Sequence, residues 1–252
     1  MFQPAVSIRP AVTPYAPESS ASRPRIFSDT WDSDRHGLLE GIQRRWRRER
    51  RRRKVGRAYD MALEIARYVP LNSRVLDVGC GNGFIAHHLS ALLGANVIGI
   101  DLEATTAAVI DYRKFDGSNF PVADGDVDAV LLCYVLHHTQ DLDVVLSELR
   151  RVLSEHGLAI VYEDIPAAWW DRIVCWTHNL KWRKRTGPCT FRDASEWRAQ
   201  FYSADFEFLQ ERKLSRWRNL AHPVSRRLYV LRRKYSRPSY SAPRLRTSAK
   251  AL

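Results

Sequence analysis

Short apolar runs alternate with segments of helical periodicity through most of this chain, at the spacing of an α/β domain. The first runs are apolar at nearly every position, which is typical of strands buried on both faces of a parallel sheet. The predicted strands are residues 74–78, 96–101, 109–115, 128–133, 158–162, 206–214 and 227–231, and the last two read as an antiparallel hairpin at the sheet edge. Residues 56–69, 84–93, 167–184 and 193–201 carry the helical pattern, with Asp193 as an N-cap.

The stretch VLDVGCGNG at 75–83 ends the first strand in a turn with three glycines at alternate positions. Glycine suits a turn whose bare backbone approaches a ligand, because a Cβ would block the approach. Asp77 is an unusual residue for a buried strand, since an unpaired carboxylate there is unfavourable. We therefore expect it to hold a positive or hydrogen-bonding group at the carboxyl end of the strand, where open α/β sheets bind ligands. The dinucleotide fingerprint G-x-G-x-x-G is not met, because position 84 is Phe84.

The second strand ends in Asp101, 22 positions after Gly79. An acid at this place can accept both hydroxyls of a ribose, so it supports a nucleoside ligand without identifying it. The crossover that follows, residues 102–108, is shorter than the dozen or so residues of a full crossover. The sequence therefore predicts a truncated or missing third helix.

Asp77 with the G-x-G-x-G turn resembles motif I of the class I S-adenosylmethionine-dependent methyltransferases. Downstream segments are similar to the small-molecule methyltransferases called type 11, and the similarity covers residues 55–165. The matching positions are Asp116, Pro121, Asp128, the run Tyr134-Val-Leu-His-His138, Asp141, Glu148, Arg151-Val-Leu153 and Gly157. Glu155 stands in a turn that usually contains proline.

The resemblance implies a Rossmann-like, seven-stranded sheet with helices on both faces, strand order 3-2-1-4-5-7-6 and an antiparallel last strand. It also implies S-adenosylmethionine as the cofactor. Its methionine part would lie against Asp77, Gly79, Cys80 and Gly81, its ribose against Asp101, its adenine against Leu102, Asp116 and Gly117, and its methyl group against Cys133 and Tyr134.

For the residues that would act on the methyl acceptor, the sequence leaves two alternatives open. His138 and Glu163, at the ends of neighbouring strands, could remove a proton from the acceptor; alternatively, His137 and His138 pack in a loop and Glu163 pairs with an arginine. No metal site is predicted, because His137 and His138 are adjacent and no second cluster at ligand spacing accompanies them.

The tryptophans between 169 and 182 could cover an aromatic or lipophilic acceptor, or form the inner face of an amphipathic helix. Cys189, in the only Pro-Cys pair, is more typical of a structural cysteine than of a nucleophile. The fourth strand ends in Leu-Cys-Tyr and lacks the Asn/Asp-Pro-Pro-aromatic run of the nucleic-acid amino-methyltransferases.

The net charge of +12 is concentrated at two places. Residues 44–54 hold nine Lys/Arg against one acid, and residues 212–252 hold thirteen and no acid, so the middle of the chain is acidic. These two basic segments could bind RNA or an anionic membrane surface, or they could be solvated runs of charge. Four cysteines without a C-x-x-C pair, and the absence of a secretory signal or a membrane span, lead us to expect a cytoplasmic protein.

The predicted organisation is a disordered tail at 1–34, an Arg-rich segment at 35–54, a methyltransferase domain at 55–234 and a basic flexible tail at 235–252. The expected function is methyl transfer to a small-molecule acceptor at O, N or C. Two alternatives stay open, an RNA methyltransferase that uses its Arg-rich arms and a non-catalytic binding protein of the same fold. The acceptor and the oligomeric state cannot be predicted.

Overall fold

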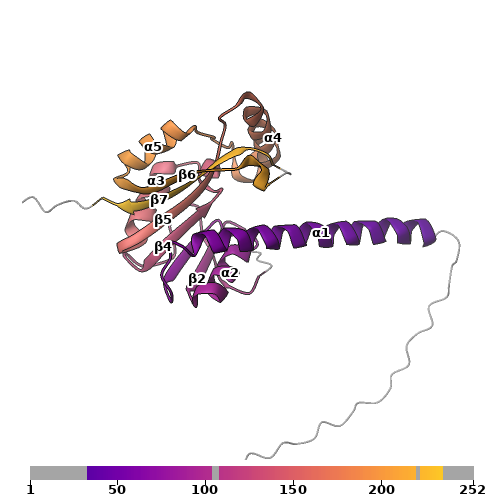
Figure 1. Ribbon diagram of the computed structural model, residues 1–252, viewed down its shortest axis with the longest axis horizontal. Coiled ribbons are helices and arrows are strands. Elements are labelled where there is room, and N and C mark those ends of the chain that lie inside the picture. The colour runs from indigo at the N-terminus through magenta and orange to yellow at the C-terminus, as the bar shows by residue number, and fades with distance from the viewer. Residues whose placement is uncertain (1–32, 104–107, 220–221, 235–252) are drawn as a thin grey trace, which may run out of the picture. The chain divides into compact units, whose positions relative to one another are not determined.

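A computed structural model describes residues 33–103, 108–219 and 222–234 (Figure 1). The chain divides into two compact units, residues 1–49 and 50–252. The predicted tails fall almost wholly outside the described residues. In the first unit, residues 40–49 are helical and exposed, as expected for a helix that is polar on all faces.

Seven strands form one sheet in the order β3-β2-β1-β4-β5-β7-β6. The strands are β1 Arg74–Val78, β2 Asn96–Asp101, β3 Asp111–Lys114, β4 Val127–Cys133, β5 Leu153–Ile165, β6 Phe206–Leu214 and β7 Ser225–Arg233. β1 to β5 pair in parallel, and β7 runs antiparallel to both β5 and β6. The predicted strand order and antiparallel strand are confirmed.

The helices are α1 Ser33–Ile65, α2 Phe84–Leu93, α3 Leu142–Val152, α4 Trp169–Thr186 and α5 Ala194–Ser203, with 3-10 turns η1 Leu136–His138 and η2 Arg216–Arg218. Two apolar clusters lie on opposite faces of the sheet, because alternate strand residues point to opposite sides. On one face, α3 and α5 pack over Leu76, and on the other, α2 and the end of α1 pack over Val75 (Figure 1). The predicted packing of residues 56–69 beside the first strand is confirmed.

Helix boundaries follow local capping. Asp193 accepts hydrogen bonds from the N–H groups of Ser195 and Glu196, and Glu196 in return accepts from Asp193 N at 2.6 Å. This reciprocal capping box confirms the predicted start of α5. α2 lies between Gly83 and Gly94, both with left-handed backbone, and has the predicted bounds.

The structure moves several predicted bounds, most clearly those of β5 and β3. β5 begins at Leu153, five residues before the predicted strand, because its first residues pair with β4 around an irregularity at 127–129. β3 has only four residues. In the short crossover before it, residues 102–103 and 108–110 are not helical, whereas 104–107 lie outside the described residues.

Trp169, Trp170 and Trp176 do not form an inner face of α4, since each is exposed, whereas Trp182 is half-buried. Trp169, Ile173, Trp176 and Leu180 follow one another on one side of the helix, and each is 44% to 69% exposed. The buried residues of α4 are Asp171 and Cys175. Asp171 holds the helix in place, since its carboxylate accepts Ala168 N at 2.9 Å and Ser225 N at 3.3 Å. No helix among the described residues is long and apolar enough to cross a membrane.

Candidate functional site

The glycine turn after β1 is tightly closed. Gly79, Gly81 and Gly83 all have positive φ, between 53° and 71°. The N–H groups of Gly79 and Cys80 both donate to Ile100 O of β2, at 2.8 and 3.1 Å. A Cβ on Gly79 would lie 2.5 Å from a methyl carbon of Val135, whereas one on Gly81 would meet no atom within 4 Å. The turn is therefore packed on one side and open on the other.

Asp77 is buried just before this turn, with 1% of its surface exposed. Its Oδ2 atom has no hydrogen-bond partner among the described residues. Burial, and then the charge of Asp101, raise the pKa of its carboxyl to about 7, although the N–H of Ala86 donates to it and acts in the opposite direction. A buried carboxylate with a free oxygen is suited to a cationic or N–H-bearing ligand.

Asp101 is the last residue of β2 and is hydrogen-bonded to the glycine turn. Its Oδ2 accepts Gly81 N at 2.8 Å and its Oδ1 accepts Glu103 N at 3.2 Å. A Cβ on Gly117 would lie 3.3 Å from a methyl carbon of Leu102. The ends of β2 and β3 thus bring together Asp101, Leu102 and Gly117, which the sequence assigned to the nucleoside end of a cofactor.

Asp116 is an exposed turn residue in this arrangement. Its Oδ1 accepts the N–H groups of Ser118 and Asn119, both at 2.8 Å. These hydrogen bonds hold the pKa of its carboxyl well below the usual range. The carboxylate stabilises its own loop, and contact with an adenine amino group stays a prediction.

Tyr134 follows β4 with a left-handed backbone, φ 63°, and its N–H donates to Tyr162 O at 2.8 Å. Arg226 lies over its ring, with the guanidinium carbon 5.5 Å from the ring centroid. Burial raises the pKa of the Cys80 and Cys133 thiols, so both stay protonated near neutral pH. Neither is placed as a thiolate nucleophile.

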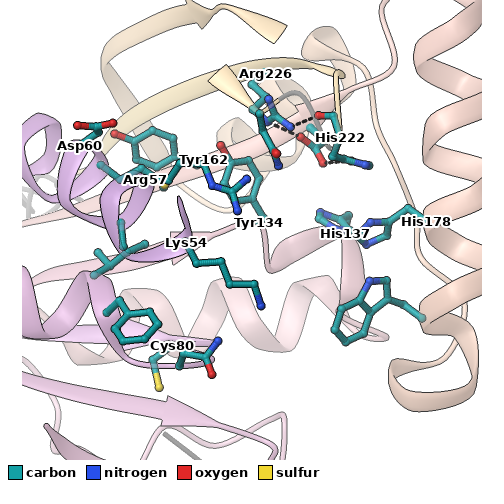
Figure 2. Close-up of a pocket in the computed structure, with 18 of the residues that line it drawn as sticks. Lys54, Arg57, Asp60, Cys80, Tyr134, His137, Tyr162, His178, His222 and Arg226 are labelled. Carbon is teal, nitrogen blue, oxygen red and sulfur yellow. Dashed lines mark hydrogen bonds and ion pairs between the residues drawn. The ribbon is translucent and has the colours of Figure 1, made fainter. Parts of the chain in front are cut away.

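A cavity of about 810 Å³ opens at this turn (Figure 2). Of the predicted cofactor residues, Cys80 and Tyr134 line it, whereas Asp77, Asp101 and Asp116 do not. Its walls combine aromatic, imidazole and cationic side chains from α1, α2, the turn after β4, β5, α4 and the segment that leads into β7. Among them are Phe84, Tyr134, Tyr162, Trp182, His137, His178, His222, Lys54, Arg57 and Lys181.

Glu163 pairs with His137, and among the described residues no hydrogen bond or ion pair joins the Glu163 side chain to His138 or to an arginine. Glu163 Oε2 lies 2.6 Å from His137 Nδ1, and Glu163 Oε1 accepts Leu136 N at 2.8 Å. Burial disfavours a charge on His137, but the charge and hydrogen bond of Glu163 outweigh it, so the pKa of His137 is raised. His137 Nε2 has no hydrogen-bond partner among the described residues.

His138 faces a different set of groups. Its Nδ1 lies 3.0 Å from Thr186 Oγ1 and 3.3 Å from Cys189 Sγ, and its Nε2 lies 3.2 Å from His178 Nε2. Burial, and then the charge on His137, lower the pKa of His138 to about 3 and that of His178 to about 4. Both imidazoles are therefore neutral at physiological pH. The sequence analysis missed His178, because nothing in the pattern of α4 shows that it meets η1.

At the cavity wall, Asp164 contacts two side chains, His222 and Arg226. Its Oδ2 lies 2.8 Å from His222 Nε2, and its Oδ1 lies 2.9 Å from Arg226 Nε. Burial raises the pKa of Asp164, but the hydrogen bond of His222 and the charge of Arg226 outweigh it, so the net shift is downward. This ion-pair cluster ties the loop before β7 to the end of β5.

Sequence comparison identifies a methyltransferase domain, type 11, over residues 76–161. A 2-phytyl-1,4-naphthoquinone methyltransferase of Synechococcus elongatus is 29% identical over 148 residues, which is 53% of this chain and 58% of that protein. A ubiquinone biosynthesis O-methyltransferase of Brucella ovis is 31% identical over 125 residues, 39% of this chain and 50% of that protein. The chain thus spans only half to three-fifths of these curated relatives.

Solved structures share the fold at low identity. A SAM-dependent methyltransferase from Methanosarcina mazei aligns with a TM-score of 0.54 and 16% identity, over 68% of this chain and 96% of that one. The cyclase SpnF aligns with a TM-score of 0.57 and 17% identity, over 70% of this chain and 81% of that one. The second match shows that this fold alone does not determine the reaction. Residues 76–161 are thus a methyltransferase domain of type 11, set in a sheet with the strand order expected for a class I methyltransferase.

Proposed function

We propose that this chain transfers a methyl group from S-adenosylmethionine to a hydroxyl oxygen of a small aromatic acceptor. The observation that carries the proposal is the free Oδ2 atom of Asp77, buried beside a glycine turn that opens into the cavity. A carboxylate held at a pKa of about 7 gains most from a ligand that brings a positive charge or N–H donors to it.

The residues at the turn fit such a cofactor. Asp77, Gly79, Cys80 and Gly81 would hold its amino-acid part, since the open side of Gly81 leaves space against the backbone. Asp101 would accept the ribose hydroxyls with the lone pairs that Gly81 N and Glu103 N leave free. Leu102, Asp116 and Gly117 would border the adenine, and Cys133 and Tyr134 the methyl group. When bound, S-adenosylmethionine supplies an electrophilic methyl carbon on its sulfonium.

The lining of the cavity supports an aromatic acceptor that carries a negatively charged or acidic oxygen. Phe84, Tyr134, Tyr162 and Trp182 offer ring faces and edges to a planar molecule. Lys54, Arg57 and Lys181 surround the same space and would attract a phenolate or carboxylate. The naphthoquinone and ubiquinone relatives, by their names, also point to ring-bearing acceptors.

The exposed face of α4 supports a lipophilic acceptor. Trp169, Ile173, Trp176 and Leu180 form an apolar stripe on this helix. Other residues of the same helix, among them Thr177 and Lys181, line the cavity. An isoprenoid tail that leaves the cavity beside α4 would meet this stripe.

His137 is the group we propose to take the acceptor proton. Its Nδ1 is held by Glu163, which fixes the tautomer and stabilises the imidazolium that forms when Nε2 gains a proton. His138, which the sequence suggested as a proton acceptor, is held by Thr186 and His178. We assign His138 a supporting place beside the base.

The RNA alternative rests on residues 44–54, which are helical and exposed. A walled cavity with aromatic sides suits a small molecule better than a polymer, so we place RNA second. Binding of an anionic partner by this segment stays a prediction, and it would show as affinity that falls steeply with salt. The tail at 235–252 lies outside the described residues.

The test is a methylation assay with methyl-labelled S-adenosylmethionine and a panel of phenols, catechols and hydroquinones, with mass spectrometry of the product. We expect label on oxygen in wild type, and a loss of about 100- to 10,000-fold in kcat for His137→Ala, with cofactor affinity kept. His156→Ala, an exposed histidine of β5, is the control. Label on RNA, or no transfer by protein that binds the cofactor, would contradict the proposal.

A further inference from the structure

Three imidazoles from two separate parts of the chain converge at the cavity wall. His137 and His138 come from η1, and His178 comes from α4, 40 residues later. One ring nitrogen of each lies within 4.8 Å of the others. Figure 2 shows His137 and His178 next to one another at the edge of the cavity. We propose that these three histidines bind one divalent transition-metal ion, such as Zn²⁺.

The distances are close to those of a ligand set. Two nitrogens bound to Zn²⁺ at about 2.0–2.1 Å in a tetrahedral site lie about 3.3–3.4 Å apart. His138 Nε2 and His178 Nε2 are 3.2 Å apart, so an ion can bridge them with little movement. His137 supplies the third nitrogen, within 4.8 Å of the other two.

The outer hydrogen bonds select the nitrogens that would bind. Glu163 Oε2 accepts a hydrogen bond from Nδ1–H of His137, and Thr186 Oγ1 lies 3.0 Å from Nδ1 of His138. Both contacts leave the lone pair on Nε2, which is the arrangement that a carboxylate or hydroxyl gives to a metal-binding histidine. His137 is 1% exposed and its Nε2 has no partner among the described residues. A buried acceptor atom without a donor is the independent sign that a ligand belongs there.

The fourth coordination position would face the cavity. His137 and His178 both line it, so water or an acceptor oxygen can reach an ion held between them. Cys189 Sγ lies at the Nδ1 edge of His138, away from the proposed ion, and we do not count it as a ligand. Three protein nitrogens with one open position are typical of a catalytic zinc site.

The inference goes beyond the proposed methyl transfer, in which Nε2 of the metal-free His137 takes the acceptor proton. With an ion on Nε2, His137 can no longer take a proton, and the ion would lower the pKa of a bound hydroxyl instead. Metal content and activity are thus separate readouts. Metal binding without methyl transfer would contradict only the proposed function and would leave the metal site supported.

The experiment uses untagged full-length protein, loaded with Zn²⁺, dialysed and analysed for metal, alongside Co²⁺ loading followed by visible absorption. We expect about one Zn²⁺ per chain and the absorption bands of four-coordinate Co²⁺, displaced by Zn²⁺. His178→Gln and His138→Gln should each weaken Zn²⁺ binding at least tenfold, whereas His156→Ala should not.

Unfolding temperature gives a second readout that does not require the variants to match wild type in stability. A ligand that binds only the folded state raises this temperature, so Zn²⁺ should shift wild type and His156→Ala upward and shift the two glutamine variants less. Zn²⁺ binding of equal strength in all four proteins, or no binding by the folded wild type, would overturn the proposal.

Discussion

One carboxylate fixes both the backbone and the side chain of the turn after β4: Glu163 Oε1 accepts Leu136 N, and Glu163 Oε2 lies 2.6 Å from His137 Nδ1. Glu163 is fully buried on β5, whose central position in the sheet makes it rigid. The cavity therefore has one imidazole whose orientation is set by the sheet itself.

Replacing Glu163 by Gln should lower the pKa of His137 and destabilise the fold. The folded-state pKa of His137 is raised above its ordinary 6.5, so its contribution to stability is complete below that pH and is lost as pH rises through the folded value. Glu163→Gln should cost about 1–3 kcal/mol below pH 6 and less above pH 8. Urea unfolding across this range, with NMR titration of the histidines, measures both effects. An unchanged His137 pKa would contradict the assigned pairing.

Asp77→Asn should stabilise the protein while it removes cofactor binding. Because the pKa of the buried Asp77 carboxyl rises from 3.8 to about 7, wild type loses stability as pH increases between those values. Asparagine has no charge to bury, so the variant should gain up to about 2–4 kcal/mol at pH 8. Thermal and urea unfolding at pH 5 and pH 8 test this. Asp143→Asn, on the exposed first turn of α3, is the matched control. Equal destabilisation at both pH values would show that Asp77 is paired in the folded state.

Gly81→Ala separates backbone strain from ligand contact. Gly81 and Gly125 both have positive φ, 53° and 65°, and a Cβ on either meets no atom within 4 Å. Both alanine variants should therefore lose a similar stability, about 1–2 kcal/mol. Only Gly81→Ala should weaken S-adenosylmethionine binding, by at least tenfold, because its methyl would occupy cofactor space. Calorimetric titration of both variants compares them directly, and equal affinities would place the cofactor elsewhere.

The apolar stripe on α4 should matter for long-tailed acceptors alone. Replacing Trp169 and Trp176 by Ser should leave stability within about 0.5 kcal/mol, since both side chains are exposed. We expect KM to rise for a hydroquinone with an isoprenoid tail and to stay the same for its tailless analogue. Steady-state kinetics on the two acceptors measures this. Parallel changes for both would assign the stripe another role.

Local sequence determines much of this structure. The bounds of β1, α2 and β2 follow from apolar runs that end at glycine or at an acid, and the capping box at Asp193 marks α5 without any tertiary information. The glycine turn could also be predicted from the sequence, because the spacing of its glycines reflects backbone geometry within nine residues.

The histidine cluster could not be predicted in this way. His137 and His138 are neighbours in sequence, and only the 3-10 turn of η1 decides which of them faces Glu163. His178 reaches them because Asp171 anchors α4 against the start of β7, a contact between residues 54 positions apart. For a related reason, the sequence could not decide whether the tryptophans of α4 face inward or outward. Two small buried groups, Asp171 and Cys175, hold that helix, and the large side chains were free to face outward.

The central claim is tested most directly by calorimetric titration of the protein with S-adenosylmethionine, with NAD as a control ligand and Asp101→Asn as the variant. Asparagine keeps one oxygen to accept Gly81 N, so the turn should survive while an acceptor for the ribose hydroxyls is lost. We predict micromolar binding to wild type, at least tenfold weaker binding to the variant and no heat with NAD. Equal affinity of wild type and variant, or no binding of S-adenosylmethionine by folded protein, would contradict the cofactor site described above.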